Sequence, residues 1–385
     1  MTITGRILRR RTPTETPAPD AEHLAAVPQR ALVWRAFRRH RLAMAGLVVT
    51  GLFYLVALFG SFLAPFSSDY RNAPHTYAPP QQLHFFSRDE DGDIDLGLYV
   101  NGLESEQDPE TFEITWTEDE DTRIPVHLFV RGEPYNFLGL FETDIHLIGP
   151  ADPDQPMFLL GSDSTGRDVL SLIIHGAKIS LSIGLLGVAV AFLIGVTLGG
   201  ISGYVGGKTD TVIQRIVEFF MSIPTLPLWL GLAAALPGNW DALQRYFAIT
   251  VIVSIIGWTD LARVVRGRFL SLRQEEFVTA ARLDGSSAPR VIFRHMLPSF
   301  SSHLIASLTL SIPGMILAET ALSFLGLGIQ APEVSWGALL QEAQNVRAVS
   351  TAPWLLFPGV AVVIVVLSMN FLGDGLRDAA DPYRT

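Results

Sequence analysis

The sequence predicts an all-α polytopic membrane protein with about six membrane-spanning helices and a small β-rich domain inserted between the first two helices. Composition is the first reason, because 49 % of the 385 residues are hydrophobic and only 17 % are charged, which is too apolar for an ordinary soluble domain. The second reason is a series of long charge-free runs separated by polar segments. The net charge of -10 comes from carboxylates gathered in one such segment, so it does not indicate a cationic ligand.

Residues 1–41 are expected to form a cytoplasmic N-terminal tail. Residues 1–29 are rich in Arg, Thr and Pro, and the first apolar run is too long and begins too late for a cleaved signal peptide. The chain contains no cysteine, which excludes disulfides, thiolate metal sites and a cysteine nucleophile.

The first span is predicted at residues 42–64, a charge-free run long enough to cross about 30 Å of hydrocarbon. The second, at 179–204, carries small residues that let membrane helices approach closely, namely Gly184, Gly187, Gly195, Gly199 and Gly200. Four weaker spans are predicted at residues 216–236, 246–261, 300–324 and 354–372, each interrupted by a proline or an ionisable residue.

Orientation is predicted from the distribution of Lys and Arg. Basic residues precede the first span and gather between the fourth and fifth spans, in residues 263–298, so both segments are expected in the cytoplasm. An even number of spans then places the C-terminus, with Arg377 and Arg384, on the same side. Both chain ends and the basic loop are therefore predicted on the same, cytoplasmic side.

Residues 65–178 are expected to form an acidic extracytoplasmic insert that ends just before the second span. The segment holds more than half of the carboxylates and few basic residues. Alternating stretches at 111–116 and 126–130, bounded by Gly, Pro and Asp, are typical of short strands. The acidic run at 89–95 fails the spacing of a calcium-binding EF-hand loop, so we interpret it as a solvated turn and predict no metal site.

Two glycine-rich stretches imitate nucleotide-binding motifs without their context. Residues 206–209, Gly-Gly-Lys-Thr, resemble the end of a phosphate-binding loop, but a membrane span precedes them where a strand is needed. Residues 326–331 imitate a dinucleotide fingerprint and also follow a predicted span. The chain itself is therefore not expected to bind ATP or another cofactor.

Ionisable residues in or beside the spans are candidates for the translocation path or a subunit interface, because burying charge in lipid is costly. These candidates are Glu218, Asp260, His303 and Glu319, with Glu319 deepest in its predicted helix. Pro313, like Pro224 and Pro227, removes a backbone hydrogen bond within a span, and the expected result is either a kink or only irregular packing.

The most informative stretch lies in the basic loop, at residues 274–285 and 292–298. Small side chains at Ala280 and Ala281 permit close docking of a short helix into another protein, and Gly285 is expected to end that helix. The stretch resembles the coupling-loop motif of binding-protein-dependent ABC permeases, with Ala280, Ala281, Gly285, Leu297 and Pro298 in register and Thr279 in place of the usual Glu. The resemblance implies that the ATPase-docking residues are Glu276, Phe277, Thr279, Ala280, Ala281, Arg282, Asp284, Gly285, Leu297 and Pro298.

Residues 160–171, 318–328 and 370–382 resemble the second permease of dipeptide and oligopeptide importers. This resemblance implies the type I ABC importer permease fold, a bacterial inner-membrane location and half of a translocation pathway for peptides. It also implies four kinds of partner: a homologous permease forming a heterodimer, two cytoplasmic ATPase subunits that carry ATP and Mg, an extracytoplasmic solute-binding protein, and membrane lipid. The chain itself is expected to be a transport subunit without catalytic residues, and nucleic acid is not expected among its partners.

Three alternatives stay open at this stage. An importer of the same class could carry nickel, glycosides, opines or another small solute. A membrane-anchored enzyme could use two carboxylates of the insert as acid and base, although no His, Ser or metal-ligand constellation accompanies them. An ATP-independent channel would have no use for a docking helix between the fourth and fifth spans.

Overall fold

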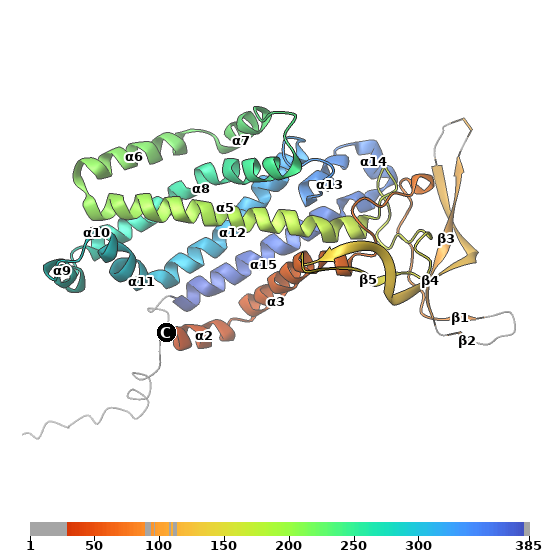
Figure 1. The fold of residues 1–385 in the computed structure, drawn as a ribbon, viewed down its shortest axis with the longest axis horizontal. Coiled ribbons are helices and arrows are strands. Elements are labelled where there is room, and N and C mark those ends of the chain that lie inside the picture. The colour runs from red at the N-terminus through yellow and green to blue at the C-terminus, as the bar shows by residue number, and fades with distance from the viewer. Residues whose placement is uncertain (1–28, 89–93, 96, 108, 111–113, 381–385) are drawn as a thin grey trace, which may run out of the picture.

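The computed structural model describes residues 29–88, 94–95, 97–107, 109–110 and 114–380. Figure 1 shows a long helical bundle with a sheet at one end and short helices at the other, and the end of α15 lies near α2, towards the α9 end. The membrane-length and neighbouring helices are α2 (Gln29–Arg39), α3 (Arg41–Leu58), α4 (Gly60–Leu63), α5 (Val169–Val205), α6 (Gly207–Ser222), α7 (Thr225–Ala234), α8 (Ala242–Leu272), α12 (Ser301–Phe324) and α15 (Phe357–Ala380).

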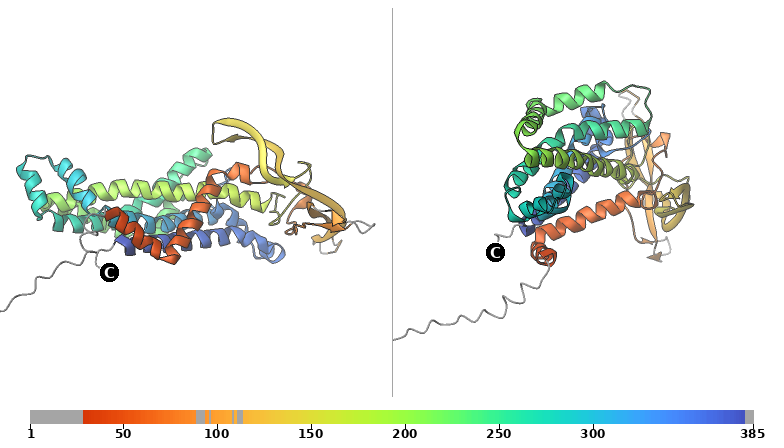
Figure 2. Two further views of the ribbon diagram at one scale, coloured as in Figure 1. Left: turned by 90° about the horizontal axis from the view of Figure 1, so that it is seen from below. Right: turned by 60° about the vertical axis from the view of Figure 1, so that its left-hand side comes forward.

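Shorter elements lie at the two ends of the bundle. At one end are α9 (Glu276–Leu283), α10 (Ala288–Arg290), the π-helical turn η2 (Val291–Met296) and α11 (Leu297–Ser299). At the other are η1 (Ala73–His75), α13 (Trp336–Glu342), α14 (Val346–Thr351), η3 (Pro353–Leu356) and the strands β1 (Ser87–Arg88), β2 (Ile94–Asp95), β3 (Leu98–Gln107), β4 (Ile114–Phe137) and β5 (Phe141–Pro150). Figure 2 shows this separation from two further directions.

Among the described residues, five helical segments are long and apolar enough to cross a membrane, and a sixth span results if the bent pair α6–α7 counts as one. The five segments contain α3, α5, α8, α12 and α15. The expectation of about six apolar helices is therefore confirmed in this range of five to six.

The central helix α5 packs most extensively against α8. A Cβ atom added at Gly195 would lie 2.9 Å from the carbonyl oxygen of Trp258, and one at Gly199 would overlap the carbonyl oxygen of Ala262. Gly203, one turn further on, faces Arg266 in the same way, at 2.7 Å from its carbonyl oxygen. The prediction that glycines in this helix permit close approach is confirmed for Gly195 and Gly199.

The predicted third span, residues 216–236, is not one straight helix. The chain forms two helices here, α6, which starts at Gly207, and α7, which ends at Ala234, and they meet at an angle of 84°. Pro224 causes the break because it disfavours helical backbone at the preceding residue, and Ile223 is extended with φ -87° and ψ 127°. The proline expected to kink this span therefore ends one helix and starts another.

The predicted fourth span, residues 246–261, is too short. Helix α8 has 31 residues and begins at a capping box in which Asp241 and Gln244 each accept from the other's backbone N–H. It continues to Leu272, through Arg263, Arg266 and Arg268. Basic side chains at the end of a membrane helix extend towards water, so the helix need not stop where charges begin.

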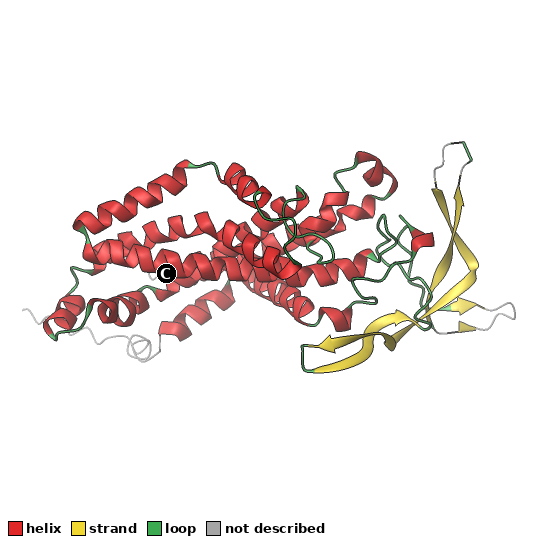
Figure 3. Ribbon diagram, turned by 45° about the horizontal axis from the view of Figure 1, so that its top comes forward, coloured by secondary structure: helices red, strands yellow, loops and turns green. Residues whose placement is uncertain are grey.

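The insert contains a three-stranded antiparallel sheet in the order β3-β4-β5 and a two-stranded ribbon of β1 and β2. Both predicted strand regions fall on β4, and residues 111–113 and most of the acidic run 89–95 lie outside the described residues. A small core of Phe66, Val100, Ile124, Val126 and Met157 holds the sheet to the chain that follows α4. Figure 3 shows the strands gathered at one end, with the β4–β5 hairpin running back towards the helices.

Candidate functional site

Helix α9 projects from the end of the bundle opposite the sheet (Figure 1). It ends in a Schellman motif, because the Gly285 N–H donates to the Arg282 carbonyl and the Ser286 N–H donates to the Ala281 carbonyl. Gly285 adopts a φ of +76°, which favours glycine. The expectation that Gly285 terminates this helix agrees with the backbone geometry.

Two faces of α9 differ in exposure. Val278 is fully buried and Ala281 is 6 % exposed, both within an apolar cluster that includes Phe269 and Met296. Ala281 therefore packs inwards and does not lie on the outer surface, contrary to the expectation that both alanines face a partner. The sequence pattern could not distinguish an alanine that faces a neighbour from one that faces its own core.

The outward face of α9 carries apolar side chains at helical spacing. Phe277 is 41 % exposed and Leu283 is 84 % exposed, and Ala280 lies between them on the same face. The exposed predicted docking residues on this helix and its cap are Glu276, Phe277, Thr279, Ala280, Arg282, Asp284 and Gly285. We call the surface formed by Glu276, Phe277, Thr279, Ala280 and Leu283 the α9 surface.

The segment after α9 holds the helix in place. Leu297 packs partly buried against the same apolar cluster, whereas Pro298 is exposed in α11. The Arg282 guanidinium lies 4.6 Å from the centre of the Tyr204 ring near the end of α5. These contacts fasten α9 to α5 and α8.

An ion pair joins α6 to α8 close to this end of the bundle. Arg266 donates through Nε to Oδ1 of Asp210 at 2.5 Å and through Nη2 to Oδ2 at 2.6 Å. The Ser202 hydroxyl also donates to Asp210, and Gln214 donates to the Ser202 hydroxyl. Sequence reasoning missed this site because Asp210 directly follows the glycine-rich stretch 206–209, which reads only as a turn between helices.

The predicted path residues do not come together. Glu218 pairs with Arg215 on the exposed side of α6, and Asp260 pairs with Arg263 on α8. His303 lies half-buried on α12, and Pro313 is buried within the same helix.

Asp260 lines a cavity between helices. Residues of α7, α8 and α12 enclose about 340 Å³ there, including Trp229, Asp260, Ser311 and Met315. Its side chain is 79 % exposed in the isolated chain, so a carboxylate opens into a mostly apolar groove.

Glu319 is fully buried between segments of its own chain. The hydroxyls of Ser180 on α5 and Ser323 on α12 donate to its carboxylate at 3.1 and 2.7 Å, and the Ser335 side chain also contacts it. Each of these hydroxyls accepts a backbone N–H, from Trp336, Ile329 and Ala338 respectively. In this conformation Glu319 thus joins α5, α12 and the chain leading into α13, and it reaches neither an open cavity nor the outer surface.

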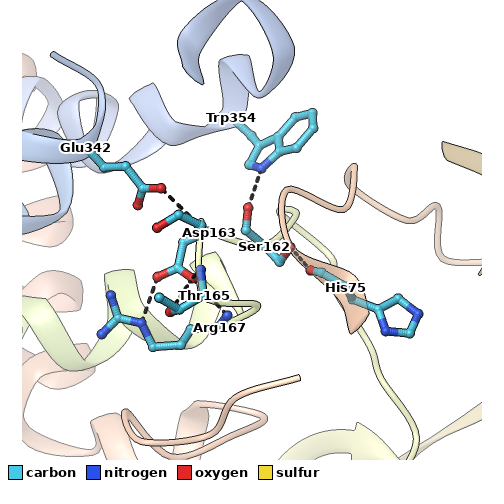
Figure 4. Close-up of polar contacts among 8 residues, drawn as sticks. His75, Ser162, Asp163, Thr165, Arg167, Glu342 and Trp354 are labelled. Carbon is cyan, nitrogen blue, oxygen red and sulfur yellow. Dashed lines mark hydrogen bonds and ion pairs between the residues drawn. The ribbon is translucent and has the colours of Figure 1, made fainter. Parts of the chain in front are cut away.

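A second polar cluster joins the insert to the bundle. Asp163 accepts hydrogen bonds from the backbone of Thr165 and Arg167, from the Thr165 hydroxyl and from Arg167 Nε at 2.7 Å (Figure 4). Hydrogen bonds also join this turn to two other segments. The Ser162 hydroxyl donates to the His75 carbonyl, and Trp354 Nε1 donates to the Ser162 carbonyl. Glu342 of α13 accepts from the Ser164 N–H. The turn therefore binds the chain before the sheet to the chain before α15.

Asp168 caps α5 from a buried position. Its Oδ2 accepts from the Ser171 N–H at 2.8 Å and from the Ser171 hydroxyl at 2.6 Å, whereas Oδ1 is buried without a hydrogen-bond partner. Burial raises the pKa of Asp168 from 3.8 to about 6, and the nearby Asp163 carboxylate adds to the increase. The ionised form of this carboxyl group is thus destabilised in the folded protein.

Replacing Asp168 by Asn should flatten the pH dependence of stability. The folded pKa exceeds the unfolded value, so the stabilising contribution is present below about pH 4 and is lost as the pH rises through about 6, by about 3 kcal/mol at about 1.4 kcal/mol per pKa unit. Asn still caps the helix and does not ionise. Thermal unfolding in detergent should show that the stability of the variant relative to the wild type is higher at pH 7.5 than at pH 4.5. An equal pH response of both proteins, with exposed Asp154→Asn as control, would contradict the assignment.

The comparisons with known proteins bear on the long helices and the α9 segment together. Residues 195–384 match the family described as binding-protein-dependent transport system inner membrane component, and residues 29–80 match the N-terminal transmembrane domain of oligopeptide transport permease C. The oligopeptide transport system permease protein OppC of Haemophilus influenzae is 40 % identical over 257 residues, covering 66 % of this chain and 80 % of that protein.

A longer alignment reaches into the insert. The dipeptide transport system permease protein DppC of Bacillus subtilis is 29 % identical over 352 residues, covering 91 % of this chain and 84 % of its own. That alignment therefore includes most of the segment between α4 and α5. Among solved structures, an inward-facing form of the MetNI methionine ABC transporter matches 55 % of this chain and 97 % of its own, at 19 % identity and a TM-score of 0.45.

A set of five to six apolar helices with a short helix displayed at one end defines a multi-pass membrane protein. The chain belongs to the family of binding-protein-dependent transport system inner membrane components, and it is a permease subunit of an ABC importer. Its place in the cell is the inner membrane, which it crosses several times, and its partners include ATPase subunits and a further permease subunit. It is a transport subunit and not an enzyme.

Proposed function

We propose that this chain forms half of a translocation pathway for di- or oligopeptides and couples it to two partner ATPases through the α9 surface. The permease names of the relatives, which are oligopeptide and dipeptide transport proteins, support the substrate class. ATP and Mg would be bound by the ATPases, so this chain contributes conformational coupling. An extracytoplasmic solute-binding protein would deliver the peptide, and a homologous permease would supply the other half of the pathway.

The exposed apolar row of the α9 surface carries the coupling part of the proposal. Phe277, Ala280 and Leu283 face outwards from a helix whose opposite side is packed on α8 and η2. A row of this kind suits burial in a groove of another subunit. Arg282 and the Gly285 turn hold the helix at a defined angle to α5.

The proposed orientation places the α9 end, the residues before α2 and the end of α15 in the cytoplasm. The excess of Arg in residues 263–298 supports this side, as does the position of the α15 end in the bundle (Figure 1). The proposed organisation is a cytoplasmic tail at 1–41, a first span at 42–64, an extracytoplasmic insert at 65–178 and a permease core at 179–385 with its coupling loop at 263–298.

For the pathway itself we propose the groove that Asp260 lines between α7, α8 and α12. A carboxylate in an apolar span normally faces a cavity or a partner, and Asp260 opens into this groove. Pro313 and His303 lie on α12, which forms one wall, and Glu218 lies on α6 at the edge of the bent pair. In the assembled importer these positions would contribute to the path or to the subunit interface.

Replacing Ala280 by Glu should abolish ATP-driven uptake of labelled peptides in vesicles that contain the whole complex. The larger charged side chain stands on the outward face of α9 and would be forced against the ATPase, while Glu is a good helix former and leaves α9 intact. Thr209→Glu, an exposed position at the start of α6, is the matched control and should retain uptake.

The two parts of the proposal fail in different ways. Full uptake by Ala280→Glu would refute docking through the α9 surface. If the wild-type complex hydrolyses ATP but moves no peptide, the substrate class is wrong and the importer must carry another solute. Co-purification of the ATPases with each variant shows whether lost uptake follows from lost association.

A further inference from the structure

The β4–β5 hairpin bends away from the sheet and returns to the end of the first membrane helix (Figure 3). Its pairing shifts register between Arg131 and Tyr135, which is where a bulge redirects a hairpin. Beyond the bulge, Phe137 lies 6.0 Å from Phe59, measured between ring centres. The ring nitrogens of His146 lie 2.8 Å from the carbonyl oxygen of Ala64 and 3.1 Å from that of Glu133. The hairpin is therefore fixed against the α3–α4 end.

Residues 134–141, which we call the hairpin tip, include apolar side chains that are exposed. The tip contains no charged residue, although Glu133 and Glu142 flank it directly. Leu138, Leu140 and Phe141 are 44 %, 77 % and 56 % exposed. Hairpin loops in water usually carry Asn, Asp or Gly, so this composition indicates a surface that is not facing water.

The turn retains leucine where the backbone disfavours it. The Leu140 N–H donates to the Phe137 carbonyl, and both residues between them have a positive φ, 52° for Leu138 and 73° for Gly139. Turns with two positive φ values strongly prefer Asn-Gly or Asp-Gly, because a side chain with a Cβ is strained there. Leu138 thus combines an unfavourable backbone with an exposed apolar side chain, and contact with an apolar phase would offset both.

The tip lies at the level where the first membrane helix ends. Asn136, Leu138 and Gly139 line a cavity of about 450 Å³ together with residues of α3 and α5, among them Leu58 and Leu185. Only 17 % of the α3 span is buried in this chain, which leaves most of its surface for lipid or a neighbour.

Charges around this cavity are distributed as at a membrane interface. Lys178 and His175 are in its lining and lie on α5, whereas the carboxylates of Glu133 and Glu142 lie on the hairpin stem. A lysine at this level can reach lipid phosphates, and carboxylates are better solvated farther out. The charges and the exposed side chains therefore favour phospholipid over a protein partner.

We propose that the hairpin tip is a membrane-interface anchor whose Leu138, Leu140 and Phe141 side chains insert among the phospholipids beside α3. The anchor fastens the insert to the bilayer beside α3 and fixes its height above the membrane. Its assignment to the outer leaflet rests on the proposed orientation, but contact of the tip with lipid does not depend on the transported solute.

Site-directed spin labelling tests the anchor directly, because the chain has no native cysteine. The complex, with partner cysteines removed, is reconstituted in vesicles of phosphatidylethanolamine and phosphatidylglycerol and carries a nitroxide at Leu140→Cys. Collisions with oxygen, which concentrates in lipid, should exceed those with a water-soluble nickel chelate several-fold. A label at Thr117→Cys, exposed on the part of β4 that pairs with β3, is the matched control and should show the opposite ratio.

A Phe141→Cys label should report lipid as the Leu140→Cys label does, so that one distorted position does not decide the result. If both tip labels are as accessible to the nickel chelate as the control, the tip lies in water and the anchor is refuted. If they are shielded from both reagents, another protein chain covers the tip and the anchor is again refuted. Peptide uptake by the same vesicles is measured separately, so failure of the substrate proposal leaves this result interpretable.

Discussion

Replacing Glu319 by Leu should lower the free energy of unfolding by about 3 kcal/mol, which is the cost expected when buried hydroxyls lose their acceptor. Three serine hydroxyls point to this carboxylate. Each hydroxyl oxygen also accepts a backbone N–H, so removal of the carboxylate leaves the O–H donors without the acceptor they have in this cluster. Thermal unfolding of the purified chain in detergent measures the effect. Exposed Glu333→Leu, in the loop before α13, is the control and should change the midpoint little.

A double substitution separates loss of the cluster from loss of packing. If Glu319 acts by accepting from Ser180, Glu319→Leu should cost less in a Ser180→Ala background than alone, because no hydroxyl on α5 is then left unpaired. Simple addition of the two losses would show that the hydrogen bond from Ser180 contributes nothing to the effect of Glu319. A midpoint equal to the wild type in Glu319→Leu would contradict the role of the carboxylate altogether.

Replacing Arg266 by Leu should destabilise the chain by about 2 kcal/mol, since Asp210 then keeps its charge but loses a two-pronged partner. The pair is mostly shielded, with 31 % of the Arg266 side chain and 17 % of the Asp210 side chain exposed. Arg263→Leu breaks the Arg263–Asp260 pair on the same helix, whose side chains are 53 % and 79 % exposed. Because exposed pairs contribute little, that control should stay within about 0.5 kcal/mol of the wild type.

The Asp210–Arg266 pair should also affect coupling. It joins α6 to α8 beside the helix end from which α9 extends, so its loss should reduce peptide uptake per ATP hydrolysed by the complex. A thermodynamic cycle with Asp210→Asn, Arg266→Leu and the double variant gives the interaction energy. An interaction energy near zero would show that the two residues act independently. Unchanged uptake per ATP would show that the pair contributes to stability but not to coupling.

The parts predicted correctly from sequence are those controlled by local chemistry. Long charge-free runs must leave water, so the apolar helices could be located, and Gly285 could be placed at the end of α9 because a left-handed residue is needed there. Gly195 and Gly199 could be identified as contact positions, although only the structure shows that their neighbour is α8. The motif at 274–298 resembles the coupling loop of ABC permeases, and the family matches confirm that the chain belongs to this family.

Other features depend on which segments meet in space. Ala280 and Ala281 are identical in sequence terms, yet one faces outwards and the other is buried against Met296, because the helix is seated on the π-helical turn that follows it. The sequence made Glu319 a candidate for the path or a subunit interface, whereas the structure surrounds it with three serines, of α5, of α12 and of the chain before α13. The chain bends by 84° at Ile223, and the size of this bend cannot be predicted from hydropathy.

By itself the sequence determined the apolar helices and the glycine that ends α9, because burial in lipid and backbone conformation impose local residue patterns. The resemblance of its motifs to those of known permeases indicated the family. Tertiary structure alone decided the Asp210–Arg266 pair, the enclosure of Glu319, the inward turn of Ala281 and the return of the β4–β5 hairpin to α3. Each of these features depends on contacts between residues far apart in the chain. The residues next to a side chain in the sequence do not show which distant residue will neutralise or bury it.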